Sequence, residues 1–213
     1  VRRPEPAVVP EGEVAVYLVA GAEHDYVAGA ARGYIFQLLR AQLVILFGTD
    51  GMSGALADPH HQASSLEGFV PNQPFVSSPR QIDLAMNETV WSAAAGTGRE
   101  FDAFIDGLES ARKQAHRVIV FGPEDRVDWL EAISATARQH AIQLTVALVP
   151  ARLKDHFSLD AMFAAPTPLA QVLAGSIQKF NRSREFQPRD LLSRFQTLAG
   201  ETRGELIICE TSE

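Results

Sequence analysis

Three polar residues near the start of the chain have side chains suited to acid–base chemistry. Glu23 and His24 follow the apolar segment Val14–Ala20, and Asp50 follows the apolar segment Leu43–Phe47. If both segments are parallel strands, their carboxyl ends meet at one edge, where a carboxylate and an imidazole can position water or hold a polar ligand. Glu23, His24 and Asp50 are therefore the candidate catalytic residues. The structural alternative is that Glu23 and Asp25 only begin and cap the next helix, with His24 solvated beside them.

The turn around Asp50 has the glycine-rich sequence GTDGMSG. Glycines let backbone N–H groups come close to an anion, as they do in phosphate-binding loops. The candidate ligand-binding residues of this turn are Gly48, Gly51, Ser53 and Gly54. The turn matches neither G-x-x-x-x-G-K-S/T nor G-x-G-x-x-G, and Asp50 would repel a phosphate unless a metal or a sugar hydroxyl intervened. The alternative is a turn into the aperiodic segment that continues to Ser77, which is either functional or flexible.

Arg80 and Asp83 form an R-x-x-D segment after the helix start Ser78-Pro79. This segment resembles the motif by which some cyclic-dinucleotide receptors bind guanine and phosphate, but only at two fixed positions. The resemblance implies a nucleotide-like small ligand held by Arg80 and Asp83. A charge pair at the start of a helix is the alternative.

The local concentration of positive charge lies in Lys179–Arg194 (KFNRSREFQPRDLLSR). Basic side chains beside Phe180 and Phe186 suit an acidic partner, so Lys179, Arg182 and Arg184 are the candidate partner-binding residues. A solvated helix–loop–helix surface is the alternative. This segment predicts a protein partner on a chain that is otherwise acidic.

The sequence contains no complete motif for several kinds of site. Asp58, His60 and His61 lie together, but no H-x-x-x-H or Cys/His spacing completes a zinc set, so no metal site is predicted. No G-x-S-x-G nucleophile elbow occurs. The single cysteine, Cys209, lies in an apolar run and is expected to be a buried thiol. The sequence leaves the cofactor unknown.

Composition limits the classes of partner. The 213 residues carry a net charge of -7, which argues against a nucleic-acid partner, because such binding requires clustered positive charge. The apolar runs are far shorter than the ~20 residues of a membrane span, so no membrane contact is expected. A lone cysteine and no leader pattern favour a cytoplasmic location. Residues 1–12 carry three prolines and are expected to form a linker or tail before a domain at 13–213.

From Glu13 onward, short apolar runs alternate with amphipathic helical segments, which is typical of βαβ units. The expected strands are Val14–Ala20, Leu43–Phe47, Arg117–Phe121, Gln143–Val149 and Glu205–Cys209. The expected helices are Val27–Arg40, Glu100–Gln114 and those that begin at Ser78-Pro79, Gly122-Pro123, Thr167-Pro168 and Gln187-Pro188. The predicted fold class is α/β: a single Rossmann-like three-layer domain with a mostly parallel five-stranded sheet. Its pattern is similar to Rossmann-like and receiver-type domains in architecture, which does not specify function.

Incomplete catalytic motifs favour a small-ligand or partner-binding regulatory module, part of a larger protein or complex. The first alternative is an enzyme acting on a nucleotide or sugar-like substrate at the carboxyl edge of the sheet. The second alternative is a purely structural protein–protein interaction domain.

Overall fold

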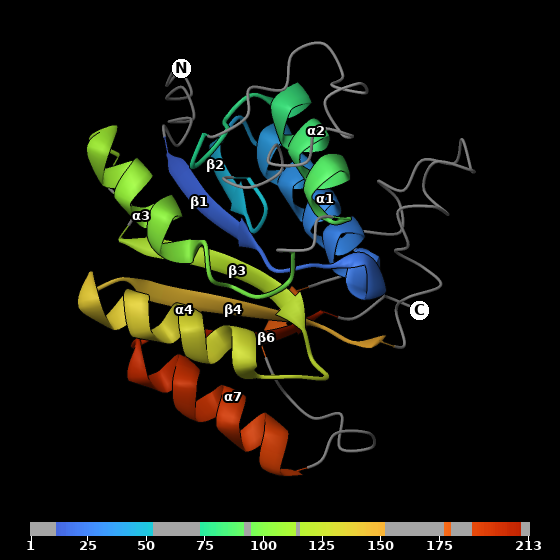
Figure 1. Ribbon diagram of the computed structural model, residues 1–213, viewed down its shortest axis with the longest axis vertical. Helices are drawn as coiled ribbons and strands as arrows, with labels where there is room; N and C mark the ends of the chain where they lie inside the picture. Colours follow the sequence, from blue (N-terminus) through green and yellow to red (C-terminus); the bar gives the residue numbers. More distant parts are fainter. Residues whose placement is uncertain are drawn as a thin grey trace, which may run out of the picture.

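The computed structural model describes residues 12–52, 73–91, 95–113, 116–151, 177–179 and 189–209. They form a sheet in the order β2-β1-β3-β4-β6-β5, with helices on both of its faces (Figure 1). The strands are β1 Glu13–Leu18, β2 Val44–Thr49, β3 Arg117–Pro123, β4 Gln143–Val149, β5 Ile177–Lys179 and β6 Glu205–Cys209. The helices are η1 Ala22–His24, α1 Asp25–Arg40, α2 Pro79–Thr89, α3 Phe101–Ser110, α4 Asp128–Gln139 and α7 Arg189–Glu201.

The sheet is parallel from β2 to β6, and the short β5 pairs antiparallel with β6 at one edge. β1 pairs with β2 on one side and β3 on the other, so the strand order reverses between β1 and β3. In such doubly wound sheets, ligands bind outside the carboxyl ends of the strands at this reversal, the topological switch point. The predicted Rossmann-like fold with a mostly parallel sheet is thereby confirmed.

Alternate residues of each central strand enter two separate cores. From β1, Val16 and Leu18 pack with α1 and α2, whereas Ala15 and Tyr17 pack with α3, α4 and α7. The period of two places successive side chains on opposite faces, and coverage on both faces explains why the strands are apolar almost throughout. Figure 1 shows α3, α4 and α7 together over one face.

The predicted start of α2 is confirmed in its side-chain detail. The Ser78 hydroxyl accepts a hydrogen bond from the Gln81 backbone N–H at 3.3 Å and donates one to Gln81 Oε1 at 3.0 Å. Pro79 takes the first helical position, where its missing N–H leaves no hydrogen bond unmade. The helix therefore begins where the sequence places it.

One predicted helix start is wrong. The pattern Gly122-Pro123-Glu124-Asp125 predicts a helix there, but β3 continues through Pro123 and α4 begins at Asp128. The Trp129 indole N–H donates to the Pro123 carbonyl at 3.2 Å, and a Cβ at Gly122 would overlap the Trp129 ring. Gly122 thus makes room for Trp129 beneath the end of a strand. The helix predicted from Thr167-Pro168 and residues 1–11 of the linker predicted at 1–12 lie outside the described residues.

Two further findings concern the edge of the sheet and the lengths of the helices. β5 is a sixth strand that the sequence pattern did not predict, and β6 runs parallel to β4. Within the described residues, every helix is too short or too polar to cross a bilayer.

Candidate functional site

The carboxyl ends of β1 and β3 are joined by a hydrogen bond between side chains far apart in the sequence. His24 Nε2 lies 3.0 Å from Asp125 Oδ2, and 101 residues separate the two along the chain. The His24 side chain is 12% exposed and that of Asp125 is 50% exposed, so the pair is reachable from solvent on the Asp125 side. Because the strand order reverses here, this pair lies at the switch point.

Tyr26 follows in the first turn of α1 and is buried, with its ring centroid 5.9 Å from that of His24. Its hydroxyl has no hydrogen-bond partner in the part of the chain that the structure describes. Burial raises the pKa of the Tyr26 hydroxyl, and the negative charges of Asp125, Glu124 and Asp25 raise it further. An unpaired buried hydroxyl costs free energy, about 1–3 kcal/mol, unless something accepts its proton. The hydroxyl is therefore a buried donor without a described acceptor.

The turns after β1 and before α3 pack against each other closely. Gly96 adopts a φ of 74°, and a Cβ there would lie 3.1 Å from the Gly21 nitrogen. Arg126, in the turn after β3, donates a hydrogen bond to the Gly96 carbonyl. Three turns at the carboxyl edge are thus fixed to one another by backbone and side-chain contacts.

Asp50, a candidate catalytic residue, is fully buried at the end of β2. Its Oδ2 accepts hydrogen bonds from the backbone N–H groups of Thr97 at 2.6 Å and Gly98 at 2.5 Å. Its Oδ1 accepts from the Tyr17 hydroxyl at 2.7 Å and from the Glu100 N–H at 3.2 Å. Burial raises the pKa of Asp50, while these hydrogen bonds oppose the rise. The carboxylate therefore satisfies the N–H groups in front of α3, where it also complements the helix dipole.

The structure separates the candidate catalytic residues into two groups. His24 is at the switch point beside Asp125, and the exposed Glu23 is its neighbour in η1. Asp50 instead faces the turn at 97–100 and Tyr17. Acid–base chemistry by Glu23 and His24 stays a prediction, and the partner of His24 is Asp125.

The glycine-rich turn begins inside the core. Gly48 belongs to β2, where a Cβ would overlap the Phe104 ring, and Gly51 is buried with a φ of 87°. The Thr49 hydroxyl between them donates to the Leu18 carbonyl at 2.9 Å. Ser53 and Gly54 lie outside the described residues. Close packing and a left-handed turn account for Gly48 and Gly51, whose contact with a ligand stays a prediction.

The remaining candidates lie on other elements. Asp83 of α2 accepts a 2.9 Å hydrogen bond from Arg32 Nε of α1, and Arg80 is exposed in the first turn of α2. Lys179 ends β5, whereas Arg182 and Arg184 lie outside the described residues. The contact from Asp83 to α1 is a structural role that the R-x-x-D pattern did not indicate.

Sequence reasoning missed Tyr17, Tyr26 and Thr97 as parts of this edge. In the sequence, Tyr17 and Tyr26 resemble ordinary core aromatics. Only their hydroxyl groups, close to the ends of strands, could have indicated a role at this edge. Thr97 lies in the GTG segment at 96–98, whose two glycines have positive φ angles. No model of a protein family and no curated protein matches the chain, so its function is argued from this geometry alone.

Proposed function

We propose that the chain is a small-ligand-binding regulatory module, part of a larger protein or complex, with its ligand at the switch point between β1 and β3. The observation that carries the proposal is the Tyr26 hydroxyl, which is buried beside the His24–Asp125 pair without a described partner. A ligand atom that accepts a hydrogen bond would remove the free-energy cost of that hydroxyl. Sites of this kind combine a few polar groups with an apolar frame.

The charges at this edge favour one class of ligand. Glu124 and the exposed Glu23 and Asp125 make it acidic, so it suits the hydroxyl groups of a sugar or a nucleoside, which donate to carboxylates. Acidic side chains take this role towards ribose hydroxyls in dinucleotide-binding domains of the same architecture. A phosphate of a nucleotide-like ligand would have to point away from these carboxylates, because like charges repel.

The role of Asp50 supports binding rather than catalysis at this edge. A general base needs an accessible carboxylate within reach of the proton that it removes. Asp50 is buried, and its oxygens are engaged by Tyr17 and by the turn before α3. The burial of Asp50 therefore favours the binding module over the enzyme alternative.

The test compares two tyrosines of α1. Calorimetric titration would measure binding of a panel of sugars, nucleosides and nucleotides, cyclic dinucleotides included, to the wild type, Tyr26→Phe and Tyr34→Phe. A panel member should bind the wild type, and Tyr26→Phe should weaken binding about fivefold, because one hydrogen bond is worth about 1 kcal/mol. Tyr34, two turns along the same helix, contacts Phe121 and serves as the matched control with unchanged affinity.

Denaturation of the same variants supplies a second readout. Tyr26→Phe should unfold at equal or higher denaturant concentration, because it removes an unpaired buried hydroxyl and keeps the ring. The proposal fails if no panel member binds, or if Tyr26→Phe binds as well as the wild type.

A further inference from the structure

A second group of polar side chains lies between α3 and α4, away from the switch point. Asp106 and Glu109 are three residues apart on α3, so they share one face of that helix. His140 directly follows the last residue of α4 and lies three residues before β4 begins. The group is therefore near the amino ends of the strands, at the opposite edge of the sheet from the proposed ligand site.

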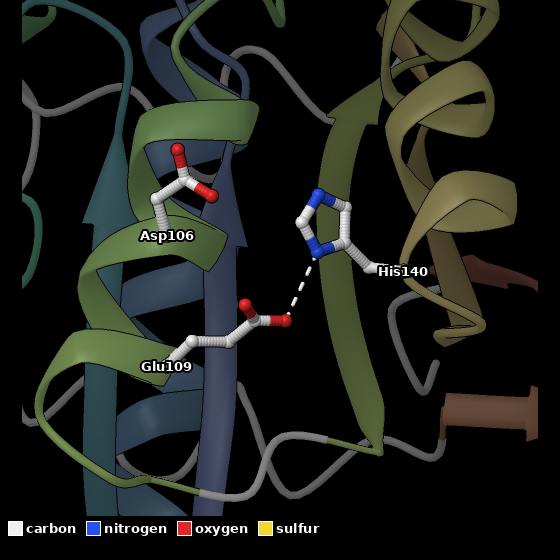
Figure 2. A group of neighbouring side chains, drawn as sticks. All are labelled: Asp106, Glu109 and His140. Atoms are coloured by element: carbon white, nitrogen blue, oxygen red, sulfur yellow. Dashed lines mark hydrogen bonds and ion pairs between the residues drawn. The ribbon is translucent and has the colours of Figure 1, made fainter.

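One ligand atom from each of these three residues lies within 4.8 Å of the other two. Figure 2 shows Asp106 and Glu109 directed from α3 toward the imidazole of His140. His140 Nδ1 is 2.9 Å from Glu109 Oε1, which fixes the ring against α3. A metal ion needs donor atoms that converge in this way from a rigid support.

The fourth polar neighbour, Asp102, lies one turn further toward the start of α3. Its Oδ1 is 3.8 Å from His140 Nε2, on the other side of the ring from Glu109. Metal-bound histidines usually donate their second ring N–H to a carboxylate, which orients the ring and raises its basicity. Asp102 occupies the place of such a carboxylate.

The surroundings of His140 suit a cation. The His140 side chain is 14% exposed, and the pKa of His140 is raised by its hydrogen bond to Glu109 and by the charges of Glu109, Asp106 and Asp102. The negative charges of Glu109, Asp106 and Asp102 around the ring would also attract a divalent cation. An imidazole nitrogen with two carboxylate oxygens is a donor set typical of zinc and neighbouring transition metals.

We propose that Asp106, Glu109 and His140 bind a divalent transition-metal ion of the zinc class, which clamps α3 to the end of α4. Three protein ligands leave a further coordination position for water. Binding requires an unprotonated imidazole nitrogen, so affinity falls at low pH. This site is independent of the proposed ligand site.

The test is a titration of the metal-free full chain with Co²⁺ and Zn²⁺ by calorimetry and, for Co²⁺, by visible absorption. One equivalent should bind near neutral pH. His140→Gln and Glu109→Gln should each weaken binding by about 10–100-fold, and Asp102→Asn by about tenfold, as for residues that ligate or orient a metal. Asp106→Asn, a change at an exposed position, provides a further ligand variant if His140→Gln fails to fold.

Two controls separate this site from other histidines. His116→Gln changes an exposed histidine just before β3 and should leave affinity unchanged. The double variant His60→Gln, His61→Gln removes the histidine pair of the sequence and should also bind normally. The proposal is overturned if neither metal binds, or if binding survives His140→Gln and is lost in the His60, His61 variant.

Discussion

The Tyr17 hydroxyl donates a 2.7 Å hydrogen bond to Oδ1 of Asp50 inside the core, and so joins the end of β1 to the end of β2. The same carboxylate accepts the backbone N–H groups of Thr97, Gly98 and Glu100 in front of α3. Tyr17 also packs edge-on against Phe101, the first residue of α3, with ring centroids 5.0 Å apart. Two strands and a helix are therefore positioned by one buried carboxylate.

Removal of that carboxylate should be costly. Asp50→Ala leaves the N–H groups of Thr97, Gly98 and Glu100 and the Tyr17 hydroxyl without their acceptor, so we expect a loss of about 3–5 kcal/mol in the free energy of unfolding. Tyr17→Phe removes one donor and keeps the ring, and should cost about 1–2 kcal/mol. Urea denaturation measures both, with the exposed Thr197→Ala as a control expected within about 0.5 kcal/mol. A loss near the control value in Asp50→Ala would contradict the network.

The pH dependence of stability should report the ionisation of Asp50. Burial raises the pKa of Asp50 in the folded chain above its ordinary value of 3.8, so the folded state binds this proton more tightly than the unfolded state. The contribution of Asp50 is then most favourable below about pH 3.8 and is lost as the pH rises through the raised value. The stability of the wild type relative to Asp50→Asn should therefore fall across this window. A rise instead would mean that the hydrogen bonds to the carboxylate outweigh its burial.

Gly48→Ala tests why this candidate ligand-binding residue is a glycine. The added Cβ would overlap the Phe104 ring, which itself packs on Tyr17 at a centroid distance of 5.2 Å. Overpacking of this kind costs about 1–3 kcal/mol, which thermal or urea unfolding would detect. Gly200→Ala on α7 is the matched control, because a Cβ there contacts nothing within 4 Å. Equal stability of the two variants would contradict the packing role of Gly48.

The contribution of His140 to stability should also depend on pH, but here a hydrogen bond rather than burial raises the pKa. In metal-free protein its pKa is raised from 6.5 by the hydrogen bond to Glu109, with Asp102 and Asp106 adding to the effect. Its contribution to stability is fully present below the unfolded pKa of about 6.5 and is lost as the pH rises through the raised folded value. The stability advantage of the wild type over His140→Gln should shrink over that range. An imidazole titration by NMR at or below 6.5 would contradict it.

Much of the fold is predictable from local sequence. The β-branched runs at Arg117–Phe121, Gln143–Val149 and Glu205–Cys209 are recognisable as strands, because both faces of a parallel sheet are covered and the runs are therefore apolar after their first residues, apart from Thr145. Ser78-Pro79 begins a helix because its capping contacts involve only neighbouring residues. The helix start predicted at Gly122–Asp125 is wrong, because Gly122 belongs to β3 and makes room for the Trp129 ring. This tertiary contact overrides the local helix-start pattern.

The sites were less predictable, because their partners are distant in the chain. The location of Glu23 and His24 at the carboxyl edge follows from the order of strands, but the pairing of His24 with Asp125 requires the register of β1 and β3. The burial of Asp50 depends on the turn at 97–100. Nothing in the sequence pattern links this turn to Asp50, which lies 47 residues before Thr97. Glu109 and His140 are 31 residues apart on different helices, so no ligand spacing brings them together in the sequence.

The basic segment Lys179–Arg194 is expected to bind an acidic protein partner. Its final residue, Arg194, forms an ion pair with Glu131 of α4, and the next residue, Phe195, is buried against Trp129. That end of the segment is held by the domain, so Arg182 and Arg184 are the charges that we expect to meet an acidic partner. The attraction should act within about 8–10 Å at ordinary salt and should govern the association rate more than the dissociation rate.

In crosslinking from native lysate at low ionic strength, a partner captured by the wild type should be lost with Arg182→Glu, Arg184→Glu. It should be retained with Arg138→Glu, which reverses an exposed charge on α4. With the recovered partner, the double variant should slow association, and added salt should reduce the difference; an identical crosslinking profile for the folded double variant and the wild type would exclude this surface.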